Sequence, residues 1–254
     1  MLNHSEGCHT YGVMTAFLIL YACYYVDKKE VGHISMITVM VRKVNETYIE
    51  SHYDEILLSL YSDRRESVCR YKNRQAAYVS VTAGLMLQDV ARKELGITPE
   101  CMQIERGKYG KPFIKGYETF YYNISHSGEY VVLAYGDQPM GIDIEEIRDK
   151  NLDVAKRCFT EREYEYVTSG YRDGTGKLES ETEQERFFQI WTMKESYLKL
   201  TGAGISVPLN SFEVDPYNMC VRDTEYQFDG RGIADYHVTV CASDVSKIVY
   251  VFAE

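Results

Sequence analysis

The fold of this chain is decided by the stretch TFYYNISHSGEYVVLAYGDQPMGIDIEEI, residues 119–147. Runs rich in β-branched and aromatic residues alternate in it with two turn signals, at residues 127–128 and 136–139. This pattern predicts three strands joined by two tight turns, as an antiparallel meander. The second turn is also the best candidate for a boundary between two halves of the chain.

The third of these strands, residues 140–147, carries two acids among isoleucines. Asp143 and Glu145 share one face, with Cα atoms roughly 7 Å apart, because alternate residues of a strand point the same way. Ile142 and Ile144 share the other face and can fill a core. Two carboxylates on a fixed strand can share a hard cation through their oxygens. This motif alone leaves open the alternative, a sheet face whose acids point into water.

A helical pattern follows in RFFQIWTMKESYLKLTGAG, residues 186–204. Its core-facing stripe consists of Phe187, Ile190, Trp191, Lys194, Glu195 and Leu198. The carboxylate of Glu195 thus falls beside apolar side chains, where it is costly unless it is paired or bound to a metal. Lys199 lies one turn further on, within reach of Glu195. The alternative is a partly buried Glu195–Lys199 pair that only orders the helix.

Other candidate binding residues come from separate segments. Ser125 and His126 end a predicted strand just before a glycine, and with a phosphate nearby their hydroxyl and imidazole can donate hydrogen bonds to it. A lone histidine at such a place is otherwise a turn or core residue. Lys111 lies in a Gly-Pro turn, where its charged head can be held over a ligand. A basic stretch upstream comprises Arg64, Arg65, Arg70, Lys72 and Arg74.

The rest of the chain alternates between strand and helix signals. We predict a strand over 36–44, a strand–turn–strand over 102–114 and short closing strands. Helices are predicted over 53–62, 75–96 and 185–200, and another begins at Thr160 with a capping box to Glu163. Residues 168–185 are predicted to form a polar loop. The long helix should stop at Gly96. Because both signals are interleaved in each half, the predicted fold class is α+β, with two lobes of similar size.

Composition limits the class of protein. With 254 residues, 45% hydrophobic and 26% charged, the chain has an ordinary soluble globular composition. Its net charge of −10 argues against a general nucleic-acid binder, so an anionic ligand would need a local basic site or a metal. The seven cysteines are scattered without a C-x-x-C pair, which favours a reducing cytoplasm over a disulfide framework or a zinc site.

Residues 1–35 form an N-terminal extension of unknown role. The apolar run VMTAFLILYACYYV, residues 13–26, is short for a membrane span, and no Lys or Arg precedes it as a secretory signal would require. We expect no membrane span here, but an appended strand or helix, or a segment upstream of a true start at Met36. An anchor or signal is the less favoured alternative.

Four of these segments, taken together and in this order, resemble the 4′-phosphopantetheinyl transferases. They are Gly110-Lys111-Pro112, NISHS at 123–127, GIDIE at 141–145, and Trp191 with Lys194, Glu195 and Lys199. The last two, about fifty residues apart, are the most specific part of the signature. The resemblance covers roughly residues 36–254 and is to the larger, monomeric branch that includes the surfactin-synthetase activator.

The resemblance implies two pseudo-symmetric α/β lobes, residues 36–136 and 137–254, each a small, mostly antiparallel sheet packed on a long helix. Coenzyme A would bind between them as co-substrate. A Mg²⁺ ion, or Mn²⁺ in its place, would be held by Asp143, Glu145 and Glu195. The implied reaction transfers the 4′-phosphopantetheine group from coenzyme A to a serine of an apo acyl or peptidyl carrier protein and releases 3′,5′-ADP.

The resemblance also implies roles for single residues. Glu195 would accept the proton of the carrier serine, and Lys199 would neutralise charge on the leaving group. Coenzyme A would be contacted by Arg64, Lys111, Ser125, His126 and Lys194. Within the long helix, Val79 stands where the family usually has an arginine for the 3′-phosphate, so Lys72 or Arg74 is expected to substitute for it.

Two other functions stay open from the sequence. One is a degenerate paralogue that binds carrier proteins without catalysis, against which the retained acids and Lys199 speak. The other is a different Mg²⁺-dependent phosphate-binding enzyme. Carriers of fatty-acid, polyketide and nonribosomal-peptide synthesis are all compatible with the leading hypothesis.

Overall fold

The computed structural model describes residues 36–149, 152–172, 176–177 and 182–253. They belong to one compact unit, Ser35–Glu254. The predicted extension at residues 1–35, with the strand-or-helix interpretation of its apolar run, lies outside the described residues, as does part of the predicted loop at 168–185.

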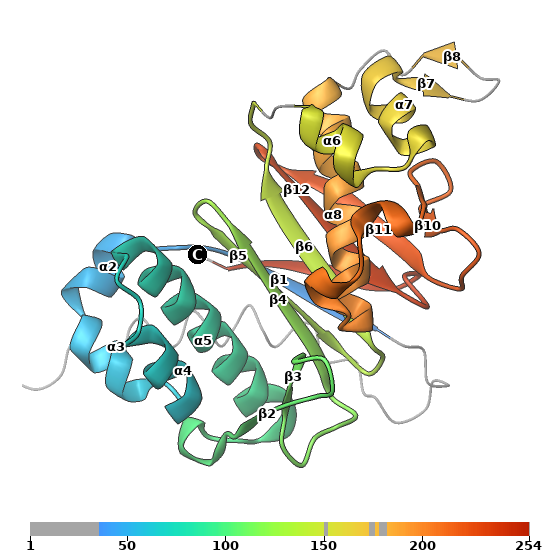
Figure 1. Cartoon of the computed structure of the whole chain (residues 1–254). Helices are drawn as coiled ribbons and strands as arrows, with labels where there is room; N and C mark the ends of the chain where they lie inside the picture. Colours follow the sequence, from blue (N-terminus) through green and yellow to red (C-terminus); the bar gives the residue numbers. More distant parts are fainter. Residues whose placement is uncertain (1–35, 150–151, 173–175, 178–181, 254) are drawn as a thin grey trace, which may run out of the picture. The chain divides into compact units, whose positions relative to one another are not determined.

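The first sheet contains four strands in the order β13–β1–β5–β4 (Figure 1). Its strands are β1 (Ile37–Lys43), β4 (Tyr121–Ser127), β5 (Tyr130–Gly136) and β13 (Ile248–Ala253). β5 is antiparallel to both of its neighbours, whereas β13 returns from the end of the chain to run parallel to β1. The predicted closing strand therefore completes a sheet that begins with the first described strand.

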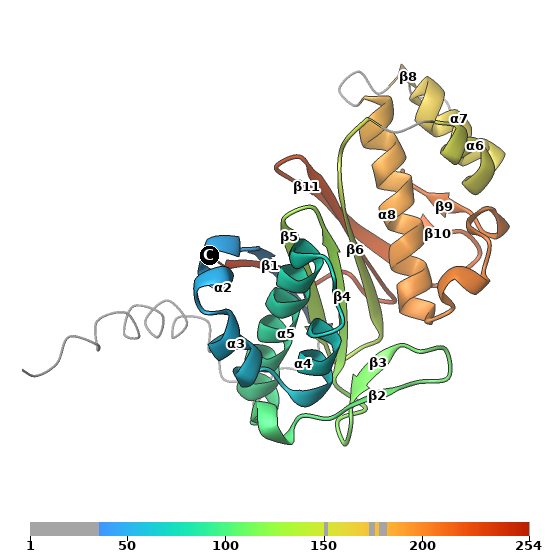
Figure 2. The same ribbon diagram turned by 60° about the vertical axis from the view of Figure 1, so that its left-hand side comes forward.

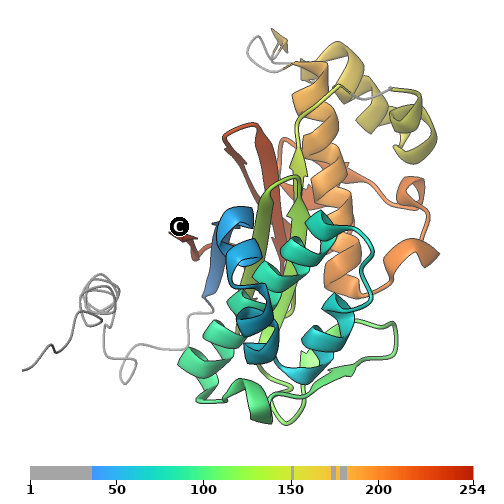
Figure 3. The same ribbon diagram turned by 90° about the vertical axis from the view of Figure 1, so that its left-hand side faces the viewer.

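Helix α5 (Arg74–Leu95) covers the outer face of the first sheet, and it ends at Gly96 with φ +69°, as predicted. Asn73 caps its start by accepting from the Ala76 N–H at 3.2 Å. The predicted helix over 53–62 is split in two. The short helices beside α5, blue to teal in Figure 3, are α2 (Glu46–Ser51), α3 (Tyr53–Ser59) and α4 (Ser62–Val68).

The second sheet contains five antiparallel strands in the order β6–β12–β11–β10–β9. They are β6 (Met140–Glu146), β9 (Val214–Asp215), β10 (Cys220–Val221), β11 (Gln227–Ile233) and β12 (Tyr236–Ala242). Helix α8 (Glu183–Thr201) packs on β6 and β12. It begins two residues before the predicted start, because Thr182 and Glu185 form a capping box.

The remaining strands and α-helices of the described residues lie around the two sheets. They are β2 (Ile104–Arg106), β3 (Pro112–Ile114), α6 (Asp153–Cys158), α7 (Glu161–Ser169), β7 (Tyr171–Arg172) and β8 (Gly176–Lys177). α7 opens with the predicted capping box of Thr160 and Glu163. Among the helices of the described residues, none combines the length and apolar character needed to span a bilayer.

The predicted meander is wrong at its second turn. β5 and β6 follow each other in sequence, yet β6 pairs with β12 and begins the second sheet. Gln138 lies between β5 and β6 and is bound to the loop that precedes β13. Its Nε2 donates to the Asp244 carbonyl at 2.7 Å, and its Oε1 accepts from Ser243 Oγ at 2.9 Å. Pro139 has no N–H with which to continue a ladder. The chain therefore crosses from one sheet to the other at this turn.

The inner faces of the two sheets pack against each other. The core between them contains alternate residues of all four central strands, among them Val39, Val132, Ile142, Ile144 and Val240. Figure 2 shows the resulting layers, with α5 and α8 outside and the strands between them. The predicted α+β fold, with two mostly antiparallel sheets that each pack on a long helix, is confirmed. The division into lobes at residues 136 and 137 stays a prediction, and β13 assigns the end of the chain to the first sheet.

Candidate active site

The two acids of β6 lie on the face of the second sheet that α8 covers. Asp143 and Glu145 are alternate residues of the strand and share this face with Gly141. A Cβ atom at Gly141 would overlap the main chain of α8. Because this position carries no side chain, the helix approaches the strand closely, and its last turns bring Glu195 and Lys199 beside the acids.

Asp143, Ser125 and Lys199 form a triangle of polar contacts. The Lys199 Nζ donates to Asp143 Oδ1 at 2.6 Å and to Ser125 Oγ at 2.7 Å, and Ser125 Oγ donates to the same Asp143 oxygen at 2.8 Å. The Asp143 side chain is only 5% exposed. Its other oxygen, Oδ2, is buried and has no hydrogen-bond partner among the described residues. A buried carboxylate oxygen in this state is free to accept a ligand.

The pKa values of the three predicted metal ligands are all raised. Burial raises the pKa of Asp143 above its usual range, even with the Lys199 ammonium beside it. The pKa of Glu145 is raised first by burial and then by the charge of Asp143. The pKa of Glu195 is raised by the same two causes in the same order, and Glu145 adds to them. The charge of Asp143 therefore disfavours the charged forms of both glutamates, and a cation among the three carboxylates would relieve this repulsion.

A metal would not find its ligands already gathered. Within the described ranges, no group of three or more Asp, Glu, His or Cys side chains is arranged to hold an ion. The Lys199 ammonium instead engages Asp143. The donor set nevertheless suits Mg²⁺ or Mn²⁺, since it offers carboxylate oxygens, one of them buried and unpaired. Lys199 contacts only Oδ1, so an ion bound at Oδ2 would share the Asp143 carboxylate with the ammonium.

Comparison with known proteins finds one family over most of the described chain. Residues 139–241 match the 4′-phosphopantetheinyl transferase superfamily, and residues 47–138 match the N-terminal part of a 4′-phosphopantetheinyl transferase. The 4′-phosphopantetheinyl transferase gsp of Aneurinibacillus migulanus is 35% identical over 182 residues, 71% of this chain and 72% of that protein. The chain belongs to the 4′-phosphopantetheinyl transferase superfamily.

Two further relatives extend the comparison. The 4′-phosphopantetheinyl transferase Sfp of Bacillus subtilis (strain 168) is 29% identical over 207 residues, which cover 74% of this chain and 87% of Sfp. The mouse L-aminoadipate-semialdehyde dehydrogenase-phosphopantetheinyl transferase is 25% identical over 227 residues, which cover 77% of this chain and 71% of the mouse protein. The predicted family, of the Sfp-like type, and the predicted enzyme class of 4′-phosphopantetheinyl transferase are therefore confirmed.

Two predicted phosphate contacts of the transferase, Arg64 and His126, lie near each other. Arg64 on α4 donates from Nε to the Tyr61 hydroxyl at 3.1 Å and from a terminal nitrogen to Ser80 Oγ at 3.3 Å. The pKa of His126 is lowered by its surroundings, first by desolvation and then by the charges of Lys199 and Arg64. The His126 side chain is still exposed, so its ring can reach a ligand. His126 and Lys199 thus lie beside Asp143, and Arg64 is a further positive charge near His126.

Arg74 is the first residue of α5, Lys72 precedes the helix by two residues, and both are exposed. Arg74 forms a surface ion pair with Glu50 at 2.5 Å. Such a pair is weak, because both partners are solvated, so it leaves the guanidinium available to a stronger anion. Their proposed substitution for an arginine at Val79 stays a prediction.

Lys111 binds main-chain oxygens of the transferase. Its Nζ donates to the carbonyls of Met140 at 2.8 Å and Leu200 at 3.2 Å, and so it joins the β2–β3 loop to β6 and to the last turn of α8. Burial lowers the pKa of Lys111 to about 8. A contact with coenzyme A would require its ammonium to leave these carbonyls, and that role stays a prediction.

The structure places Lys194 away from the predicted ligand site. Its side chain is fully buried, and its Nζ donates to Glu163 Oε1 at 2.8 Å and to the carbonyls of Leu209 and Phe212 at 2.8 and 2.7 Å. All three protons of the ammonium are used in these bonds. No part of Lys194 is left to contact coenzyme A, so we remove it from the predicted site and assign it to the packing of α8.

The sequence does not reveal the roles of two residues, Ser127, which supports the site, and Glu163, which holds α8. Ser127 was part of the quoted motif but received no role, although it donates to Glu145 Oε2 at 3.0 Å. The signal that could have found it is its place two residues after Ser125 on the same strand. Glu163 was assigned only to a helix cap. Its contact with Lys194 had no local signal, because the two residues lie on different helices.

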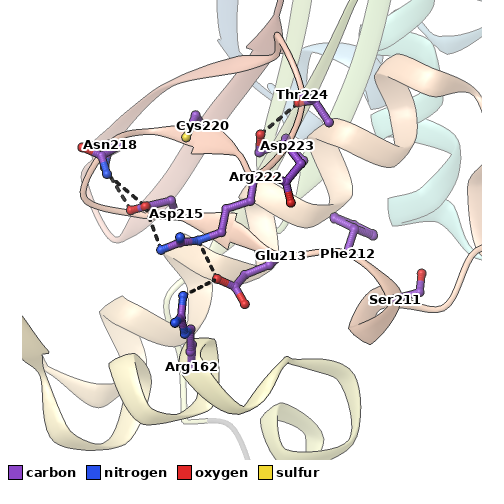
Figure 4. A pocket seen from close by; sticks show the side chains of 11 residues that line it. Arg162, Ser211, Phe212, Glu213, Asp215, Asn218, Cys220, Arg222, Asp223 and Thr224 are labelled. Atoms are coloured by element: carbon purple, nitrogen blue, oxygen red, sulfur yellow. Dashed lines mark hydrogen bonds and ion pairs between the residues drawn. The ribbon is translucent and has the colours of Figure 1, made fainter. Parts of the chain in front are cut away.

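A surface depression of about 880 Å³ lies elsewhere, on β9, β10 and the start of α7 (Figure 4). Its two arginines form ion pairs with two of its acids. Arg222 contacts Glu213 at 2.5 Å and Asp215 at 3.1 Å, and Arg162 contacts Glu213 at 3.7 Å. β9 is the strand of the second sheet furthest from β6, so this depression does not belong to the carboxylate site.

Proposed function

We propose that this transferase is a holo-carrier-protein synthase that depends on Mg²⁺. It moves the 4′-phosphopantetheine group from coenzyme A to a serine of an apo acyl or peptidyl carrier protein and releases 3′,5′-ADP. The observation that carries this proposal is the meeting of Ser125, Asp143 and Lys199, from three different elements, beside an unpaired carboxylate oxygen. The relatives' names support the group transferred.

In this proposal Asp143, Glu145 and Glu195 hold the cation. When bound, a divalent cation stabilises negative charge on the pyrophosphate oxygens as a Lewis acid. His126 and Arg64 supply positive charge for the phosphates of coenzyme A, because His126 lies beside Asp143 and Arg64 is near His126. Arginine suits such a contact, since its planar fork can donate two parallel hydrogen bonds to one phosphate.

The proposed reaction is a displacement at phosphorus. The serine oxygen of the carrier bonds to the β-phosphorus of coenzyme A, and the bond from this phosphorus to the 3′,5′-ADP oxygen breaks. Glu195 accepts the serine proton, for which a carboxylate with a raised pKa is suited. Lys199 places its ammonium against the developing charge of the leaving group. Positioning and electrostatics thus account for most of the catalysis.

Intact-mass analysis of carriers tests the proposal. Apo carriers of fatty-acid, polyketide and nonribosomal-peptide synthesis are each incubated with the enzyme, coenzyme A and Mg²⁺. We expect one of them to gain the mass of a single phosphopantetheine group, and its Ser→Ala variant to gain nothing. If coenzyme A binds but no carrier is modified, the chain is a non-catalytic carrier binder. If ATP binds in place of coenzyme A in the presence of Mg²⁺, the enzyme uses another phosphate substrate.

A further inference from the structure

The two sheets meet edge to edge at β4 and β6 through side chains. Neither strand extends its backbone ladder to the other, since β4 pairs with β5 and β6 pairs with β12. Instead, alternate residues of β4 point at β6. Asn123 Oδ1 accepts from the Ile142 N–H at 2.9 Å, and Ser125 and Ser127 follow at two-residue intervals. We call these three residues the seam residues.

Ser127 is the seam residue that contacts Glu145. Its Oγ donates to Glu145 Oε2 at 3.0 Å and accepts from the Glu146 N–H at 3.1 Å. The hydroxyl is therefore held on both sides, and its proton is directed at the carboxylate. Among the described residues, the Glu145 side chain accepts its hydrogen bond from Ser127.

The position of Ser127 is set by the second sheet. The next residue, Gly128, begins the turn with φ +52°, and a Cβ atom there would overlap the Tyr236 hydroxyl of β12. That hydroxyl also accepts from the Glu129 N–H at 3.4 Å. The turn is thus pressed against β12, which is the strand that pairs with β6. β12 therefore fixes both residues, Glu145 through its pairing with β6 and Ser127 through the turn that follows it.

We propose that Ser127 is a positioning residue that orients the Glu145 carboxylate for a divalent cation shared with Asp143. This inference rests on the proposed function, because it assumes the metal site. A half-buried carboxylate on a strand can adopt several rotamers, and a single directed hydrogen bond selects among them. Partners of metal ligands in other proteins change metal affinity by about 10- to 100-fold when they are removed.

Mn²⁺ titration of the enzyme without coenzyme A, followed by electron paramagnetic resonance or calorimetry, tests this role. We expect Ser127→Ala to weaken Mn²⁺ binding by about tenfold or more. Ser127→Cys keeps the size of the side chain but is a weak donor, so it should fold normally and also weaken the metal. In turnover assays, both variants should need more Mg²⁺ for half-maximal rate, and their kcat should recover as Mg²⁺ is raised.

Asn123→Ala is the matched control, because it removes a seam contact that touches no carboxylate. It should lower the melting temperature but keep the Mn²⁺ affinity of the wild type. Unchanged Mn²⁺ binding in Ser127→Cys, or equal weakening in Asn123→Ala, would overturn the positioning role and leave Ser127 as part of the seam alone. Failure of the wild type to modify any carrier would instead count against the proposed function, while its Mn²⁺ affinity would still report on Ser127.

Discussion

The ammonium of Lys199 lies 2.6 Å from Oδ1 of Asp143, and the two side chains form the ion pair at the centre of the candidate site. Asp143 is almost fully buried, whereas Lys199 keeps 28% of its side chain exposed. The same carboxylate is a proposed metal ligand. A divalent cation and the Lys199 ammonium would therefore compete for one buried group.

Lys199→Met should tighten metal binding in the absence of coenzyme A. The variant removes a positive charge next to the carboxylate, and an opposed pair about 4 Å apart near a protein surface interacts by about 4 kcal/mol before solvent screening. We expect Mn²⁺ affinity to rise by about tenfold, measured by calorimetry, while turnover falls. Lys199→Arg keeps the charge and should keep the weaker affinity. A Met variant that binds Mn²⁺ more weakly would show that the two cations do not compete.

Glu195→Gln and Asp143→Asn should respond differently to added metal. Glu195 is proposed to be both a ligand and the proton acceptor, whereas Asp143 is proposed to be a ligand only. Raised Mg²⁺ or Mn²⁺ should therefore restore part of the single-turnover rate of Asp143→Asn. It should not restore Glu195→Gln, because a general base contributes about 10²- to 10⁴-fold. Equal rescue of both variants would mean that the base lies elsewhere.

The arrangement of the acids was predictable because it depends on local periods. A strand repeats every two residues, which places Asp143 and Glu145 on one face, and the structure agrees. The helix period likewise placed Glu195 on the side of α8 that faces the second sheet. Gly141 lets helix α8 approach strand β6 closely. The glycine is visible in the sequence, but its purpose is visible only once α8 is known to pack on it.

The predictions that were wrong concern contacts between segments that are distant in the sequence. Lys194 and Glu195 are neighbours in one predicted stripe, but successive residues of a helix point about 100° apart. Only the position of Glu163 on α7 shows that Lys194 turns away from the acids. The crossing of β6 into the second sheet depends in the same way on the loop around Asp244, which no pattern near residue 138 announces.

His126 should take up a proton when coenzyme A binds. In the free enzyme, desolvation and then the charges of Lys199 and Arg64 hold its pKa below the usual 6.5, so the ring is neutral at pH 7. A bound phosphate would raise this pKa. Affinity should therefore increase as pH falls from the pKa of the complex to that of the free enzyme. Calorimetry at pH 7 in two buffers of different ionisation enthalpy measures the uptake, and His126→Gln should abolish it.

Arg64 should distinguish coenzyme A from its 3′-dephospho form. Its guanidinium lies near His126 and donates to neutral hydroxyls rather than to a carboxylate, so its charge is available to a phosphate. Arg64→Ala should weaken binding of coenzyme A more than binding of dephospho-coenzyme A, measured by calorimetry. Lys72→Ala and Arg74→Ala then show which of the two contributes. Equal losses for both ligands in all three variants would refute the assignment.

Lys194→Met should destabilise the enzyme by breaking a fully buried ion pair. The side chains of Lys194 and Glu163 are 0% and 1% exposed, and Glu163 also accepts from the Val214 N–H at 2.7 Å and the Thr160 N–H at 2.8 Å. The variant leaves the Glu163 charge buried without its partner, which costs about 3–5 kcal/mol. Urea unfolding measures the loss, and the exposed pair of Arg74 provides the control.

Arg74→Met removes an ion pair whose partners are 80% and 57% exposed, so it should change the free energy of unfolding by no more than about 1 kcal/mol. The double variant Glu163→Gln/Lys194→Met removes both buried charges, and Gln at this position can still form the helix cap. It should therefore be more stable than Lys194→Met alone, with a coupling free energy given by the double-mutant cycle. Additive losses would show that Lys194 acts through its bonds to the carbonyls of Leu209 and Phe212 and not through the charge of Glu163.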